Sequence, residues 1–164
     1  MNACMGFRGL AASARLENVM RLKRQKGVAA VELAIVAPVL ILILLGIAQF
    51  GWLLANYVMV ANAASAGAQN FAAQRGSSSP YTSTQTQVDS SSALLTSANL
   101  AFTTLVNSSQ CQSDTECATD LSAAMGKPAT VTVTYTFTPL LKGSMFGLVS
   151  MPGTLSNTVE VRVQ

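Results

Sequence analysis

Histidine is absent from this chain and acidic residues are scarce, so most catalytic sites lack the side chains they require. Without histidine, neither a Ser-His nor a Cys-His nucleophile pair can form. The seven Asp and Glu residues are scattered without the spacing of a paired-carboxylate site, and no glycine-rich phosphate loop occurs. We therefore predict that the protein is not an enzyme and uses no cofactor and no small-molecule substrate.

Cysteine is also rare, and its three positions favour a disulfide over a metal site. Cys111 and Cys117 enclose a short polar loop, whereas Cys4 lies near the N-terminus without a local partner. Two neighbouring cysteines in an oxidising compartment are typical of a disulfide. Zinc needs four nitrogen or sulfur ligands, which this chain does not supply. We predict a Cys111–Cys117 disulfide and no metal.

A long uncharged segment follows the basic N-terminal region and indicates a membrane helix. No charge occurs from Leu33 to Ala55, a run that spans about 34 Å as a helix and exceeds a hydrocarbon core of about 30 Å. Pro38 lies within it, which a membrane helix tolerates. Trp52 and Tyr57 stand where interfacial aromatic residues are expected. The alternative is the buried core helix of a soluble domain.

The distribution of basic residues predicts the orientation of this helix. Six of the ten Lys and Arg residues precede the run, which keeps the N-terminus in the cytoplasm and exports the rest. The same charges could suggest nucleic acid, but no aromatic stacking platform accompanies them, so we predict no nucleic-acid partner. The six residues are Arg8, Arg15, Arg21, Lys23, Arg24 and Lys26.

The exported region changes its pattern along the chain. Alanine-rich sequence predicts that the helix continues after the membrane, and a Ser/Thr/Gln-rich stretch reads as a linker. Residues 93–106 have apolar spacings of a short helix. Apolar residues that alternate with threonine over 131–138, and valines that alternate with Glu160 and Arg162 over 159–163, predict two strands. The fold class is α+β, with a second helix and a two-stranded or slightly larger antiparallel sheet. The predicted segments are a basic leader (1–27), a transmembrane helix (28–55), its extension (56–75), a polar linker (76–92) and a small α+β region (93–164).

The start of the apolar segment resembles the processing site of type IV prepilins. Gly27 and Val28 stand where that family is cut, and Glu32 is fifth after the cut. Longer blocks resemble the TadE-like family of minor pilins or pseudopilins of the tight-adherence (Tad, or Flp) pilus machinery. These blocks are Gln25–Ala34 with Pro38, Gly46–Gly51 and Ala61–Ala68.

The resemblance implies a role in pilus assembly at the bacterial inner membrane, with the C-terminal region periplasmic. It implies a prepilin peptidase, other pilins and pilus-assembly proteins as partners. A lone charge in a membrane helix costs about 2.5–3.5 kcal/mol, and the new amine of Val28 on a neighbouring subunit could neutralise Glu32. If the chain is never cut, Glu32 instead reaches the cytoplasmic interface.

Three functions remain open at this point. The first is a minor pilin-like subunit, the second an unprocessed single-pass scaffold of the same secretion machinery, and the third a membrane-anchored binding module. A further expectation concerns the leader: translation could start at Met20, because residues 1–19 carry neither a membrane-length run nor an evident fold.

Overall fold

The computed structural model describes the backbone of residues 8–140 and 151–164, and side chains from residue 27 onward within those ranges. The chain divides into two compact units, Met1–Ile47 and Ala48–Gln164. Helix α1 (Arg8–Ala73) supplies the described part of the first unit and the beginning of the second.

Helix α1 continues through residues 56–73 without a break, as its alanine-rich composition predicts. Pro38 lies inside it, and the chain leaves the helix before Gly76, which has a φ of 80°. A positive φ suits glycine, because a side chain there would meet the backbone. The basic leader predicted over 1–27 is helical from Arg8, while residues 1–7 lie outside the described residues.

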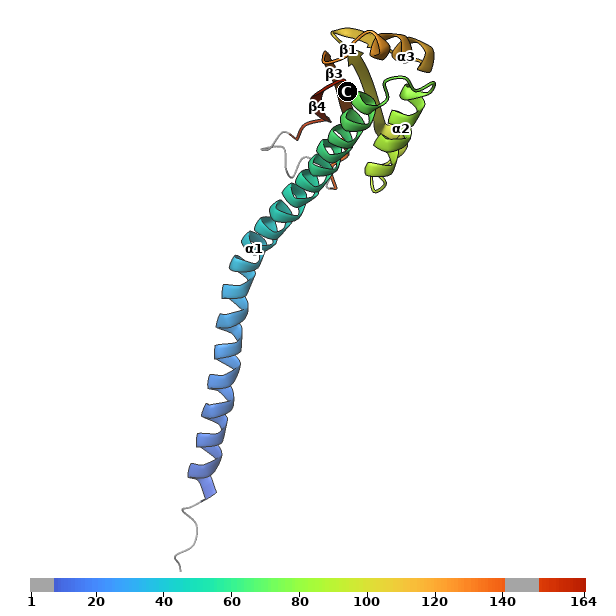
Figure 1. Ribbon diagram of the computed structural model, residues 1–164. Coiled ribbons are helices and arrows are strands. Elements are labelled where there is room, and N and C mark those ends of the chain that lie inside the picture. The colour runs from blue at the N-terminus through green and yellow to red at the C-terminus, as the bar shows by residue number, and fades with distance from the viewer. Residues whose placement is uncertain (1–7, 141–150) are drawn as a thin grey trace, which may run out of the picture. The chain divides into compact units, whose positions relative to one another are not determined.

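The second unit contains a four-stranded antiparallel sheet in the order β2-β1-β3-β4. Together with the helices it confirms the predicted α+β fold class, and the sheet is larger than two strands (Figure 1). The two strands predicted from alternating residues are present and extend further toward the N-terminus. The strands are β1 (Leu100–Val106), β2 (Ser109–Cys111), β3 (Pro128–Thr136) and β4 (Thr154–Arg162).

Two elements differ from the prediction. The expected polar linker at 76–92 contains helix α2 (Pro80–Ser91), which begins with Pro80 in its first turn and buries Thr84 and Val88 on one face. The expected helix over 93–106 is instead a short 3-10 turn, η1 (Ser97–Asn99), followed by β1. Pairing along β3 explains the second difference, because every residue of β1 has a partner there.

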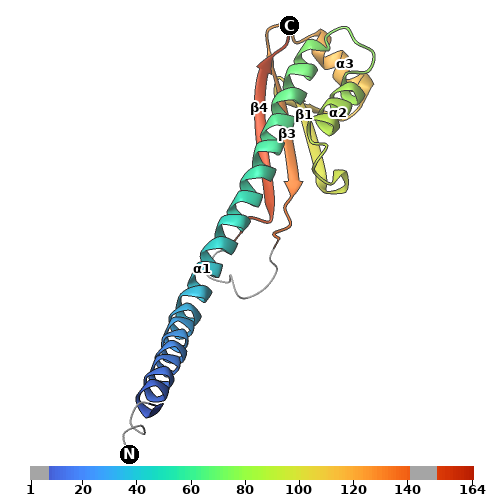
Figure 2. The same cartoon turned by 90° about the horizontal axis from the view of Figure 1, so that it is seen from below.

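One face of the sheet carries the core. The C-terminal part of α1 crosses this face over β3, with α2 and α3 (Asp114–Ser122) beside it (Figure 2). Val131 and Val133 of β3 are fully buried there, as is Phe71 of α1. Burying each such side chain contributes about 1.5–3 kcal/mol. The core therefore ties the end of α1 to the middle of the sheet.

The opposite face of the sheet is a hydroxyl-bearing surface. Thr132 of β3 and Thr158 of β4 share a hydrogen bond of 2.8 Å across the strands, and Thr134 and Ser156 share one of 3.2 Å. Because side chains alternate along a strand, the threonines that interrupt the valines of β3 all point away from the core. This face explains why half of β3 is polar in sequence.

Candidate functional site

The predicted processing site lies in the first unit, within α1. Gly27 is exposed, and a Cβ added to it would meet nothing within 4 Å. The helix nevertheless continues through this glycine in both directions. Glycine within a helix is less favourable than alanine by about 1 kcal/mol. Gly27 is therefore accessible, and the helix around it is locally less stable than it would be with alanine in its place.

Val28 and Glu32 lie on the same side of α1, because residues four apart are neighbours on a helix. The side chains of both are exposed, with 57% of the Val28 surface open. An amine created at Val28 would begin a helix whose first turns favour a carboxylate. The structure thus places Gly27, Val28 and Glu32 together on an open helix surface, and their roles in cleavage and assembly stay predictions.

The surface of α1 beyond Glu32 is apolar and unburied. Within the described part of the chain, one helix is long and apolar enough to cross a membrane: Gly27–Ala73 has a window of mean hydropathy 2.9, none of it buried. The exposed residues include Leu33, Ile35 and Leu40. Such a surface agrees with membrane anchoring by this helix.

The cysteine pair lies in the second unit and forms the predicted disulfide. Cys111 ends β2, Cys117 lies within α3, and both are buried, with 5.2 Å between their Cα atoms. The Thr104 hydroxyl donates to the Cys111 carbonyl oxygen at 2.7 Å beneath the bridge. The Ser113 hydroxyl caps α3 by accepting from the Glu116 amide. Strand, bridge and helix therefore form one local structural unit.

Removing this disulfide should cost stability without changing the fold. Cys111→Ala with Cys117→Ala is expected to lower the free energy of unfolding by about 2 kcal/mol, because the closed loop is short. Denaturant unfolding of both proteins in detergent measures the difference. Alkylation of the untreated protein should leave both cysteines unmodified until reductant is added. Free thiols at both positions in protein purified from the cell envelope would contradict the bridge.

Asp114 joins α3 to α2 through Thr82. Its two carboxylate oxygens accept from the Thr82 amide at 2.9 Å and from the Thr82 hydroxyl at 2.6 Å. The hydrogen bond from the hydroxyl, followed by that from the amide, holds the pKa of the Asp114 carboxyl below its usual range. Asp114 also begins α3, where a negative charge is favourable.

This contact predicts an acid-dependent loss of stability. Because the folded-state pKa of Asp114 lies below its unfolded value, its contribution is complete above the unfolded pKa and disappears as pH falls through the folded pKa. Asp114→Asn should therefore destabilise the protein at neutral pH and make little difference once Asp114 is protonated. Unfolding measured across this pH range tests it, with Asp89→Asn on α2 as the control. A difference that does not vary with pH would contradict the assignment.

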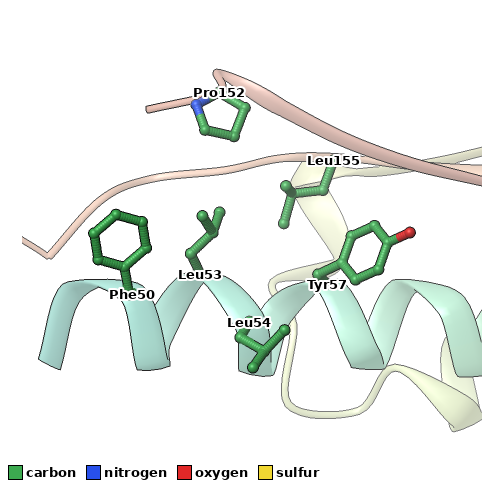
Figure 3. A pocket seen from close by; sticks show the side chains of 6 residues that line it. All are labelled: Phe50, Leu53, Leu54, Tyr57, Pro152 and Leu155. Carbon is green, nitrogen blue, oxygen red and sulfur yellow. The ribbon is translucent and has the colours of Figure 1, made fainter. Parts of the chain in front are cut away.

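An apolar groove of about 480 Å³ lies where α1 passes the start of β4. Figure 3 shows Phe50, Leu53 and Tyr57 rising from the helix toward the segment that carries Pro152 and Leu155. Leu54 completes the lining. The sequence did not predict this groove, although the spacing of its four helix residues places them on one side of α1. Its other wall comes from a segment about a hundred residues later, which periodicity alone does not locate.

Acidic and cysteine side chains are spread over the described part of the chain. Among the side chains described, those of residues 27–140 and 151–164, no group of three or more His, Cys, Asp or Glu is placed to hold a metal ion. The polar depression beside α3, lined by Gln110, Gln112, Ser113 and Glu116, contains a single carboxylate. The features described so far are an exposed glycine within α1, an apolar helix surface and a disulfide-bonded unit.

Comparison with known proteins gives one result. The family model described as TadE-like protein matches residues 27–69. The match begins at Gly27 and covers Glu32, the apolar run and most of the small-residue segment that follows it. It confirms the resemblance predicted from these residues, and it suggests a protein related to the Tad pilus. No curated protein and no solved structure gives a significant match.

Proposed function

We propose that the protein is a minor pilin-like, TadE-like membrane protein that takes part in assembling a tight-adherence type IV pilus. The observation that carries the proposal is the family match over residues 27–69, which starts at the candidate processing glycine. In this proposal the protein acts through its helix and its contacts with other subunits rather than as an enzyme. Its partners are other pilins, pilus-assembly proteins and a prepilin peptidase.

The geometry of α1 suits such a role. A subunit that leaves the membrane needs an apolar helix that packs against other helices, and the exposed residues of α1 provide one. It also needs a domain that stays folded outside the membrane, which the disulfide and the sheet core provide. The proposed location is the bacterial inner membrane, with the N-terminus cytoplasmic and the second unit periplasmic.

The unprocessed scaffold remains a second candidate because α1 continues through Gly27. A peptidase requires an extended substrate, so cleavage here must first unwind about one turn of helix. A chain that keeps its helix intact would stay in the membrane and support assembly without entering the fibre. Glu32 would then lie near the cytoplasmic interface.

Two measurements test the proposal and separate the candidates. Deleting the gene should abolish Tad pili, and the full chain supplied from a plasmid should restore them. The intact mass of the protein should decrease by residues 1–27 in cells with the prepilin peptidase and remain full-length without it. Normal pili after deletion would disprove the proposed function. Pilus loss with an unchanged full-length mass would select the scaffold.

A further inference from the structure

The apolar groove between α1 and the start of β4 has no polar side-chain lining except the Tyr57 hydroxyl. Its helix residues are not core residues hidden from the surroundings: Phe50 is 54% exposed and Leu54 is 62% exposed. On the other wall Pro152 is also exposed. A groove of about 480 Å³ lies within the usual range of ligand sites and is large enough for part of a hydrocarbon chain. Exposing such an apolar surface to water is unfavourable.

The position of the groove along α1 indicates what covers it. The uncharged run begins at Leu33, and about twenty helical residues cross a hydrocarbon core. The hydrocarbon would therefore end near residue 52, between Phe50 and Tyr57 of the groove. Exposed apolar residues of α1 also recur between the membrane segment and Leu54, among them Ile47 and Phe50.

Two polar side chains at this level, those of Trp52 and Asn56, donate hydrogen bonds within the chain. The Trp52 indole donates to the Thr138 carbonyl oxygen at 3.3 Å, and the Asn56 amide donates to the Trp52 carbonyl oxygen at 2.7 Å. Residues 128–140 and 151–159, which lead into and out of this end of the sheet, carry no charge. Polar groups that contact lipid must find their hydrogen-bond partners within the protein, because hydrocarbon neither donates nor accepts hydrogen bonds.

We propose that the groove formed by Phe50, Leu53, Leu54, Tyr57, Pro152 and Leu155 binds an acyl chain of a phospholipid in the outer leaflet. The lipid fixes the second unit on the membrane surface, with the start of β4 at the depth of the lipid ester groups. The groove is thus a binding site for lipid beyond the general insertion of α1. This inference depends on the membrane anchoring in the proposed function, and the experiment below separates the two.

The single tryptophan of the chain reports on the depth of the groove. The full-length protein is reconstituted into phosphatidylcholine vesicles with bromine atoms placed shallow or deep in the acyl chains. Shallow bromines should quench Trp52 most strongly. If the protein floats with the vesicles but Trp52 is not quenched, the inference is wrong and the anchoring stands. If the protein does not float with the vesicles, the anchoring itself fails.

A matched pair of variants tests lipid binding by the groove. Leu54 and Val58 are both exposed apolar residues of α1, but only Leu54 lines the groove. Native mass spectrometry of detergent-purified protein measures retained phosphatidylcholine. Leu54→Asn should lower the retained lipid about tenfold, and Val58→Asn should change it less than about twofold.

The other occupants of the groove give different results. A photoreactive residue in place of Leu54 should form an adduct with phosphatidylcholine in the vesicles. An adduct with a second copy of the chain, or with another segment of the same chain, would overturn the inference. Equal loss of lipid in both asparagine variants would also overturn it, because the lipid would then bind the helix surface without using the groove.

Discussion

Replacing Gly27 with leucine is expected to leave the protein in the membrane with its leader attached and to abolish Tad pili. An added Cβ at Gly27 meets nothing within 4 Å, and leucine favours a helix more than glycine does by about 1 kcal/mol. The variant should therefore fold and insert normally. The loss would arise at the peptidase, which must approach the backbone closely and unwind a helix that leucine has stabilised.

The intact mass and electron microscopy of the cells measure this result. Ala30→Leu is the matched control, because it adds a similar side chain to an exposed position one turn further along α1. It should leave cleavage and pili unchanged. If Gly27→Leu retains the full-length mass and still supports pili, cleavage is not part of the function.

Glu32→Ala should separate assembly from cleavage. Removing the carboxylate makes membrane insertion easier, by up to about 2.5–3.5 kcal/mol if Glu32 lies deep in the bilayer. We expect the leader to be removed as before and pili to be lost, because the Val28 amine of a neighbouring subunit then lacks its counter-charge. Normal pili in this variant would exclude the charge pair.

Gly67→Leu is expected to cause the largest loss of stability of any single substitution considered in the second unit. A Cβ at Gly67 would lie 2.7 Å from Cγ2 of Val88 and 3.4 Å from Cγ1 of Val131. Val88 is β-branched and cannot rotate away easily. Overpacking of a core costs about 1–3 kcal/mol, and leucine adds three carbons beyond the Cβ, so we expect a loss of about 3 kcal/mol or more.

In the smaller variant Gly67→Ala, a gain in helix propensity opposes a loss from overpacking of the core. Alanine gains up to about 1 kcal/mol within a helix, whereas the close contact with Val88 costs about 1–3 kcal/mol, so a net loss is expected. Adding Val88→Ala removes the obstructing methyl, and the double variant should be more stable than the two single effects predict. Denaturant unfolding in detergent measures all four proteins.

Gly51 provides the control, because a Cβ there meets nothing within 4 Å in the same helix. Gly51→Ala should be neutral or slightly stabilising. Additive effects of Gly67→Ala and Val88→Ala would show that the two residues do not press on each other, contrary to the packing seen between α1 and α2.

The sequence predicted those elements whose pattern is independent of tertiary contacts. The uncharged run of α1, the disulfide and the alternation of Val131 and Val133 with threonines can each be recognised from the local sequence alone. Strand β1 cannot be recognised in this way, because the spacing of its leucines and phenylalanine also fits a helix. Only its pairing with β3 favours the strand over the helix. Tertiary context overrides local preference in such segments.

Helix α2 was missed for a related reason. Its Ser and Thr residues have low helix propensity and compete for backbone hydrogen bonds, and its only buried side chains are Pro80, Thr84 and Val88. The helix is stabilised by contacts with Gly67 of α1 and with Asp114 of α3. The groove beside Leu155 likewise requires segments distant in sequence. Proline at the start of α2 was the one local signal available.

In the proposed topology, the order of the core residues along the chain sets the order in which they cross the membrane. Val60 to Ala72 of α1 emerge first, but their partners Val131 and Val133 follow some sixty residues later. Under the proposed topology, the face of α1 that packs on these valines therefore lacks this partner until β3 has followed it. The Cys111–Cys117 pair can oxidise before that moment, since both thiols and the intervening residues precede β3. In that order of export the disulfide can form before the hydrophobic core of the second unit closes.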